Sequence, residues 1–248
     1  FVCFQKTGTD EFIEKYIGSV APEEFKNENE LFQSKNLTYL NPEVREVESL
    51  EYIDKLQLNS NLQLNDIKGL IHFHTQFSDG IATPEEMVEE AVKQGLIYQV
   101  ISDHSKTAVY ANGLTENRIL QQHDEIIRLR KQGYNLFHSI ESDILPDGNL
   151  DYDEDVLKSL DFVIASVHSR FDMTKEEMTS RIIKAIENPY TDLIGHVSGR
   201  VLLRRKAYEL DIYKILDACV ANDVAIEINS APSRLDLDWR YIYYAREK

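Results

Sequence analysis

The sequence predicts an α/β domain built on a buried parallel sheet and preceded by a smaller segment of mixed structure. From Asp66 onward, short apolar runs alternate with helical patterns, which is typical of strand–helix units in a parallel sheet. The apolar runs are rich in β-branched residues and poor in charge, as expected of strands that helices cover. Several runs end in histidine or a carboxylate, and β/α barrels place their chemistry at the carboxyl ends of their strands.

The length and composition fit this fold class. The chain has 248 residues, of which 42% are hydrophobic, enough for one large α/β domain and a flanking piece. No apolar stretch approaches the roughly 18 residues that a membrane helix needs, and no signal peptide is visible. Because Cys3 and Cys219 cannot make a disulfide framework, we expect reduced cysteines and a cytoplasmic protein without a membrane partner. The sequence gives no indication of oligomeric state.

The net charge of −16 argues against one class of function. Non-specific binding of nucleic acid over a large face requires clustered basic residues, whereas here 43 carboxylates outnumber 27 Lys and Arg. Most of these carboxylates are expected to form an acidic, solvated surface. A phosphate-bearing substrate at one local site stays compatible with this charge, because bound divalent cations reverse the local field.

Residues 1–66 are expected to form a separate part of the chain. They are predicted to begin with a short strand and a turn, followed by a helix that starts near Thr9, with Thr9 or Asp10 as its cap. A mixed, polar stretch with a break at Asn41-Pro42 follows. The whole segment is therefore interpreted as the end of a preceding domain and a connector.

The stretch 57–66 is rich in Asn and Gln and predicts a domain boundary, so that residues 67–248 form the main domain. The chain begins at Phe1 in the middle of an apolar run and ends at Lys248 just after a helix-like stretch. Both ends have the character of cuts, so we expect a fragment of a longer protein.

The main domain shows strand and helix signals in alternation. Thr83 and Thr174 each precede an acidic first turn, a pattern that caps helices. Strands are predicted at residues 68–73, 97–102, 134–141, 161–167, 192–196 and 224–229. Helices are predicted at residues 84–94, 115–132, 174–187, 211–222 and 236–246. Six strands are fewer than a closed eight-stranded barrel requires.

The spacing of His72 and His74 predicts a metal site. They end the first strand, and because a strand turns successive side chains to opposite faces, both are expected on one face. Burying two imidazoles side by side without partners would cost about 1–3 kcal/mol each. Neutral imidazoles are also the usual nitrogen ligands of hydrolytic metal sites, so we predict that both bind metal.

Five more candidate ligands lie at or just after strand ends. Asp79 precedes Gly80 in a loop, so a simple turn role competes with a ligand role. Either Asp103 or His104 could be a ligand, and the alternation of side chains along the strand favours His104. Glu141 lies in an apolar strand, where an unpaired carboxylate is costly, which favours a ligand that bridges two cations. The five candidates are Asp79, His104, Glu141, His168 and His196.

Four other residues are given ordinary roles. His123 lies in the middle of a predicted helix among polar neighbours and is expected to be exposed. His138 has the opposite strand parity to Glu141 and is expected to face away from the ligands. Asp143 and Asp147 are interpreted as turn residues, Asp147 in a hairpin.

Basic and polar residues near the ligands are candidates for substrate binding. An arginine fork recognises phosphate through two parallel hydrogen bonds, and Arg200 is the preferred candidate for this role. Arg204 and Arg205 are interpreted as surface charges. The candidate substrate-binding residues are Lys106, Arg170, Arg200 and Asn229.

The motifs "HFHTQFSDG", "ISDHSK", "SIESDILPDGNLD", "ASVHS" and "GHVSGRVLLRR" resemble those of the polymerase and histidinol phosphatase (PHP) family. The resemblance covers about residues 67–248, and the order and spacing of the motifs make it specific. The longer strings are most similar to the C-terminal PHP domain of bacterial family X DNA polymerases. Residues 1–66 are similar to the end of the polymerase region and the linker that precedes that domain.

The resemblance implies a distorted seven-stranded TIM-like (β/α) barrel with two or three divalent ions of manganese, zinc or iron. It implies hydrolysis of phosphoester bonds at DNA 3′ ends, of the 3′-to-5′ exonuclease type, in DNA repair. In the implied ligand set, His72, His74 and Glu141 hold the first ion. Glu141 bridges to a second ion, which His168 and His196 also hold. A third ion is implied to bind Asp79 and His104. The implied catalytic residues are His72, His74, Glu141, His168 and Arg200.

The sequence departs from the family pattern at its end. The pattern closes with a seventh strand that carries an Asp-x-His pair, and this chain ends before such a pair. Asp236 and Asp238 are not equivalents, so two of the implied sites are expected to lack one ligand each, and the barrel is expected to be incomplete. Two alternative functions stay open: a small-molecule phosphatase of the histidinol phosphatase type, and a non-catalytic structural PHP module.

Overall fold

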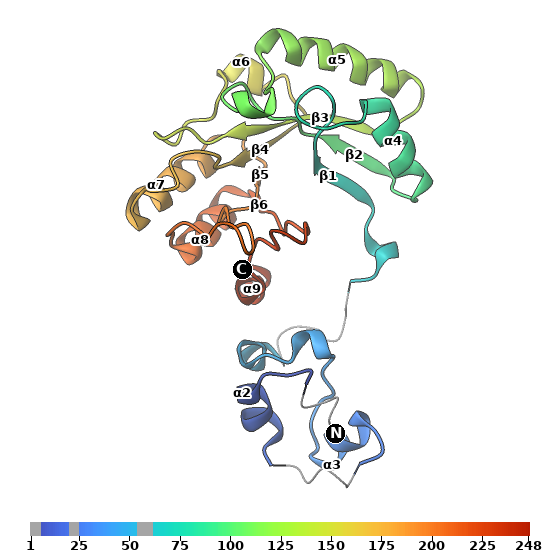
Figure 1. The fold of residues 1–248 in the computed structure, drawn as a ribbon, viewed down its shortest axis with the longest axis vertical. Coiled ribbons are helices and arrows are strands. Elements are labelled where there is room, and N and C mark those ends of the chain that lie inside the picture. The colour runs from blue at the N-terminus through green and yellow to red at the C-terminus, as the bar shows by residue number, and fades with distance from the viewer. Residues whose placement is uncertain (1–5, 20–24, 54–61) are drawn as a thin grey trace. The chain divides into compact units, whose positions relative to one another are not determined.

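The computed structural model describes residues 6–19, 25–53 and 62–248 (Figure 1). The chain divides into two compact units, Phe1–Asp66 and Ile67–Lys248. The predicted N-terminal strand, Cys3 and the first half of the predicted boundary stretch lie outside the described residues. None of the described helices is both long enough and apolar enough to cross a membrane.

The first unit is built from short helices. Helix α2 (Asp10–Phe12) begins at Thr9, whose side chain accepts a hydrogen bond from Phe12 N (3.2 Å), and it continues as a π-helical turn, η1 (Ile13–Ile17). The predicted cap at Thr9 is confirmed. The described part of this unit also contains helix α3 (Glu28–Ser34) and three 3-10 turns. The 3-10 turns are Pro42–Val44, Val47–Tyr52 and Leu64–Asp66.

The second unit contains a parallel sheet of six strands that pair in the order of the sequence. The strands are β1 (Gly69–Phe73), β2 (Tyr98–Ile101), β3 (Leu136–Asp143), β4 (Phe162–Ser166), β5 (Leu193–Ile194) and β6 (Ala225–Ile226). The sheet curls into a half-barrel, as Figure 1 shows from β1 round to β6. The prediction of an incomplete β/α barrel is therefore confirmed.

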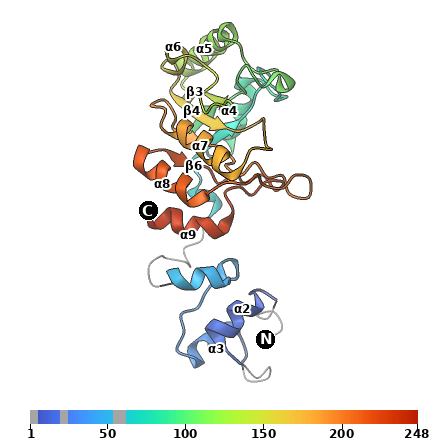
Figure 2. The ribbon, with the colours of Figure 1, turned by 90° about the vertical axis from the view of Figure 1, so that its left-hand side faces the viewer.

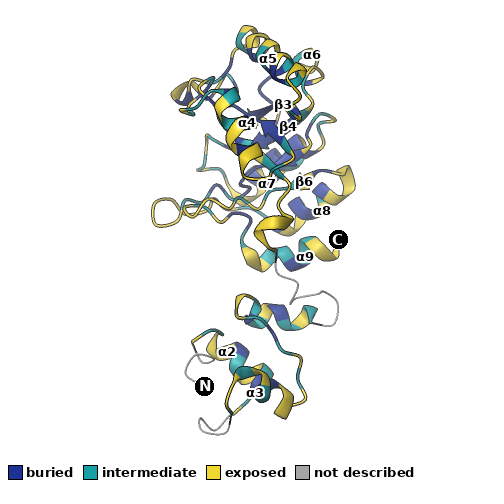
Figure 3. Ribbon diagram, turned by 90° about the vertical axis from the view of Figure 1, so that its right-hand side faces the viewer, coloured by how far each residue is buried: buried dark blue, intermediate teal, exposed yellow. Residues whose placement is uncertain are grey.

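Helices connect successive strands along one side of the curled sheet (Figure 2). Thr83 and Thr174 cap α4 and α7 with reciprocal hydrogen bonds to Glu86 and Glu177, as predicted. These helices are α4 (Pro84–Lys93), α5 (Glu116–Lys131), α6 (Glu154–Leu157), α7 (Lys175–Ile186) and α8 (Ile212–Asn222). Most residues of β2, β3, β4 and β5 and the inner faces of these helices are buried (Figure 3) and form the core, whereas β1 and β6 at the two edges of the sheet are largely part-exposed.

The last predicted helix, at residues 236–246, begins later than expected. Asp236 is extended and pairs with Asn229 in an isolated bridge, and its side chain accepts hydrogen bonds from Ser198. Asp238 caps a 3-10 turn, η6 (Trp239–Tyr241), which leads into α9 (Ile242–Glu247). The prediction was wrong at this boundary because two aspartates bind partners outside the helix.

A chain of polar contacts joins α5 to the back of β3. Gln122 donates to Asp103 (2.6 Å), and its Oε1 lies 3.2 Å from Nε2 of His138. Nδ1 of His138 lies 3.2 Å from Nδ1 of His123. His123 is half-buried rather than exposed as predicted, because β3 brings the buried His138 against this face of the helix.

We predict that lowering the pH from 7 to 5 destabilises the wild type by about 2 kcal/mol more than a His138→Gln variant. Burial lowers the pKa of His138 to about 4, so the unfolded chain binds a proton that the folded chain does not bind. The stabilising contribution is complete above the ordinary histidine pKa and is lost as the pH falls towards 4. Urea unfolding at both pH values measures the difference, and an equal pH dependence of the two proteins would contradict this prediction.

Candidate metal centre

Five histidines converge on Glu141, which lies in β3. They come from β1, from the segment just after it and from the carboxyl ends of β2, β4 and β5, so the curl of the sheet brings together residues far apart in the sequence. The shortest distances from an imidazole nitrogen to a Glu141 carboxylate oxygen are 2.9 Å for His72, 3.6 Å for His74, 2.9 Å for His104, 3.3 Å for His168 and 2.9 Å for His196.

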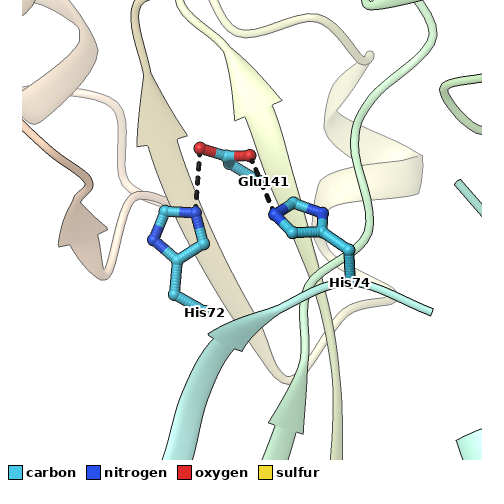
Figure 4. A group of neighbouring side chains, drawn as sticks. All are labelled: His72, His74 and Glu141. Atoms are coloured by element: carbon cyan, nitrogen blue, oxygen red, sulfur yellow. Dashed lines mark ion pairs between the residues drawn. The ribbon is translucent and has the colours of Figure 1, made fainter. Parts of the chain in front are cut away.

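The geometry around Glu141 fits a cation better than hydrogen bonds. Glu141 has no exposed surface, and neither of its carboxylate oxygens has a hydrogen-bond partner among the described residues. Figure 4 shows His72 and His74 on either side of this carboxylate, each with a ring nitrogen towards it. A buried carboxylate without a hydrogen bond is costly. Imidazole nitrogens that converge on such a carboxylate without forming hydrogen bonds to it fit a metal ion shared between them.

Three groups of described side chains have ligand atoms close enough together to hold a metal ion. The groups are His72, His74 and Glu141; His74, Asp79 and His104; and His104, Glu141 and His168. The first group is the set that the resemblance implies. The second group adds His74 to the implied pair of Asp79 and His104. The third group contains His104 in the place where the resemblance implied His196. Nε2 of His196 nevertheless lies 2.9 Å from Glu141.

His72 reaches the centre through a distortion of β1 rather than by regular alternation. The pairing of β1 with β2 shifts register between Leu70 and Phe73, and His72 has a φ of 61°. A register shift of this kind redirects a side chain, and a positive φ in a residue other than glycine is strained. Gly195 leaves room for the redirected ring, since a Cβ there would lie 3.1 Å from Cε1 of His72.

Asp103 holds the loop that carries His74 and Asp79. This fully buried carboxylate accepts hydrogen bonds from the backbone N–H and the hydroxyl of both Thr75 and Ser78. The structure therefore places His104 in the centre and gives Asp103 a supporting role. Gly80 allows the loop to close tightly, since a Cβ there would lie 2.3 Å from the carbonyl oxygen of His74.

Two carboxylates that the sequence analysis did not assign to the site orient the histidines. Oε1 of Glu227 lies 2.5 Å from Nδ1 of His72, and Oδ1 of Asp143 lies 2.5 Å from Nδ1 of His168. A carboxylate on Nδ1 fixes the ring and directs Nε2 towards a metal. Asp143 was interpreted as a turn residue, and this was wrong because it ends β3 beside His168. Asp147 is a turn residue as predicted, and it accepts hydrogen bonds from Asn149.

The charges of the centre are strongly coupled. Burial lowers the pKa of His72 and His168, but the carboxylates beside them outweigh it and raise these pKa values to about 10 and about 9. Burial lowers the pKa of His74 to about 4, and neighbouring imidazoles add to this effect. Burial raises the pKa of Glu141, but the imidazoles prevail and hold it well below its usual range. The pocket therefore keeps its carboxylate ionised, as a metal ligand must be.

The predicted substrate-binding residues have partners of their own. Nζ of Lys106 lies 2.6 Å from Glu116, and the exposed Arg170 lies 3.5 Å from Asp172. The side chain of Asn229 donates to Glu227 and accepts from the backbone N–H of Ala231, so it closes a turn at the end of β6.

Arg200 is also occupied. Its Nη1 lies 2.5 Å from Asp238, and its other nitrogens donate to the carbonyl groups of Arg234 and Leu235. The assignment of Arg200 to phosphate binding stays a prediction, and these contacts give it a structural role. Asp236 and Asp238 bind Ser198 and Arg200 and belong to none of the three metal groups among the described residues, consistent with the view that they do not replace an Asp-x-His pair.

Comparisons with known proteins point to one family. The family model of the PHP domain matches residues 71–231. The DNA polymerase/3′-5′ exonuclease PolX of Bacillus subtilis (strain 168) is 39% identical over 228 residues, which cover 90% of this chain and 40% of PolX. A probable phosphatase of Thermoanaerobacter sp. (strain X514) is 37% identical over 166 residues, 64% of this chain and 63% of the phosphatase. The chain thus spans less than two thirds of either relative.

A solved structure is also similar. It is the histidinol phosphate phosphatase of Lactococcus lactis subsp. lactis Il1403, in complex with zinc, L-histidinol and phosphate. The match has a TM-score of 0.47 and 21% sequence identity, and it covers 65% of this chain and 72% of the other.

We predict that an Asp143→Asn variant binds Mn²⁺ about 10- to 100-fold more weakly than the wild type. The amide would keep the shape of the side chain but lose the negative charge that holds Nδ1 of His168. Isothermal titration calorimetry measures this affinity. Asp147→Asn, the same change in a turn four residues away, is the matched control and should bind Mn²⁺ normally. Equal affinities of the two variants would show that Asp143 does not support the centre.

Proposed function

The chain belongs to the PHP domain family, and on this premise we propose that its second unit is a metal-dependent phosphoesterase. The observation that carries the proposal is the fully buried Glu141, which faces five imidazoles without a hydrogen bond. Metal-dependent hydrolysis needs such a set of nitrogen and oxygen donors on one rim. The same residues would have no comparable reason to converge in a purely structural module.

Each residue of the centre has a role in this proposal. The ions would be held by His72, His74, Asp79, His104, Glu141, His168 and His196. When bound, divalent ions would activate water and offset the charge of a phosphate group. Glu141 would supply an oxygen to more than one ion, while Glu227 and Asp143, which contact Nδ1 of His72 and His168, would orient Nε2 of both rings towards the ions. Thr75, Ser78 and Asp103 would keep Asp79 and His74 in place.

We further propose that the substrate is a phosphoester at a DNA 3′ end. The match to the Bacillus subtilis polymerase/exonuclease is longer than the second unit, so it extends into the first unit as well. The match to the Thermoanaerobacter phosphatase covers only 64% of this chain. The acidic surface is compatible with this substrate because only a short end, and no long duplex, has to enter the positive field of the ions.

A small phosphomonoester is the second candidate substrate. It is favoured by the 37% identity to the probable phosphatase over 166 residues. The two candidates differ in what surrounds the phosphate, whereas the chemistry at the centre is the same.

We predict that the chain with Mn²⁺ releases nucleotides from the 3′ end of a single-stranded oligonucleotide. The double variant His72→Ala/His74→Ala should be at least about 100-fold slower because the first metal group loses both of its nitrogen donors. Electrophoresis of a 5′-labelled oligonucleotide measures the rate. A His123→Ala variant, which removes a histidine outside the centre, is the control and should keep the wild-type rate.

The outcome can contradict the proposal at two levels. Equal release by the double variant and the wild type would refute the assignment of the centre. Metal-dependent turnover of small phosphomonoesters without turnover of oligonucleotides would keep the centre and replace the DNA substrate by the second candidate.

A further inference from the structure

Tyr110 presents an exposed aromatic ring beside the metal centre. It lies in a 3-10 turn, η5 (Val109–Ala111), between β2 and α5. The residue is 73% exposed, and the centroid of its ring lies 6.2 Å from the centroid of the His104 ring. Single apolar side chains on a surface are common, so this ring is informative through its place beside a metal ligand rather than through its exposure alone.

The metal centre is open to solvent on the side of Asp79 and His74. The side chains of these two residues are 48% and 23% exposed, whereas the side chain of Glu141 has no exposed surface. The ring of His104 stacks on the ring of His74, with centroids 4.2 Å apart, and it lies beside the ring of Tyr110. Tyr110 therefore lies at the open side of the centre, where a substrate would enter.

The turn that carries Tyr110 is tied to the loop after β1, which carries the exposed ligands. The side-chain amide of Asn112 donates to the carbonyl of Ser78 (3.3 Å). From α5, the guanidinium of Arg118 donates to the carbonyl of Asn112 (2.7 Å) and to the carbonyl of Phe77. The backbone on both sides of the entry is thus fixed. A side chain on a fixed backbone loses less conformational freedom when a ligand binds.

A DNA end at this centre needs a contact that does not depend on the charge of its phosphates. The net charge of the chain is −16, and the cations predicted to bind substrate, Lys106, Arg170 and Arg200, each lie beside a carboxylate. Stacking of bases on aromatic side chains holds single-stranded DNA in any sequence, because every base has a flat π-face. A tyrosine ring supplies a large flat surface with few rotatable bonds, so it suits this role.

We propose that Tyr110 is the platform on which the 3′-terminal base of a single-stranded DNA substrate stacks. The inference rests on the proposed function, because it assumes that a DNA 3′ end enters this centre. The 6.2 Å between the rings of Tyr110 and His104 lets one nucleotide reach from the platform to the ions. Stacking would then place the phosphate that joins the last nucleotide to the strand against the metal centre, which is a positioning effect.

Two oligonucleotides test this role, one with a normal 3′-terminal nucleotide and one whose 3′-terminal nucleotide lacks its base. On the normal end, Tyr110→Ala should lower kcat/KM of the Mn²⁺-loaded chain about 10- to 100-fold. The abasic end should slow the wild type by a similar factor, and Tyr110→Ala should cause no further loss on it, because the stacking partner is already absent. Tyr110→Phe should stay close to the wild type because it keeps the ring. Electrophoresis of 5′-labelled strands measures the rates.

Val109→Ala is the matched control, since it removes an exposed apolar side chain from the same turn, and it should cleave both ends at the wild-type rate. All three variants should bind Mn²⁺ and melt like the wild type, because exposed side chains contribute little to stability.

A loss in Tyr110→Ala that is equal on normal and abasic ends, or no loss at all, would overturn the inference. An equal loss in Val109→Ala would also overturn it, because the turn rather than the ring would then be responsible. A wild-type chain that binds Mn²⁺ but hydrolyses neither oligonucleotides nor small phosphomonoesters would instead overturn the proposed function itself.

Discussion

A carboxylate without exposed surface must be matched by positive charge, and Glu141 imposes this requirement on the second unit. Imidazoles from strands on either side of β3 meet this requirement. They can reach one carboxylate only because parallel strands present their carboxyl ends at the same edge of the sheet. The curl of the sheet and the position of Glu141 in β3 therefore depend on each other. The register shift at His72 and the close approach at Gly195 are local consequences of that convergence.

Around this carboxylate the protein adds charge in layers. Glu227 and Asp143 contact Nδ1 of His72 and Nδ1 of His168. With Glu141 they give the centre three carboxylates, more negative charge than hydrogen bonds from its histidines neutralise. Divalent ions would restore this balance and give the centre the Lewis acidity of a hydrolase. Outside this layer, Arg200 brings positive charge on the loop after β5, where Asp238 and two carbonyl groups hold its side chain.

The sequence predicted the features that follow from the free-energy cost of burying polar groups and from the periodicity of apolar residues. His72, His74 and Glu141 were predicted as ligands because burying polar groups without partners is costly, and the same argument applied to Glu227 in "AIEINS" would have indicated it too. The role of Asp143 depends on the register of β3 against β4, which no local pattern shows. The contacts of Arg200 join residues more than thirty positions apart, so sequence spacing could not show that Asp238 and the carbonyl groups of Arg234 and Leu235 hold its side chain.

The central claim is that Glu141 and the histidines around it form a metal centre. Elemental analysis after exposure to Mn²⁺ and removal of free ions, for the wild type and a Glu141→Gln variant, tests this claim most directly. The amide removes the charge that the buried imidazoles and ions share, while keeping the size of the side chain. Our account predicts more than one equivalent of metal in the wild type and a clear loss in the variant. Equal metal contents in two folded proteins, or none in the wild type, would contradict it.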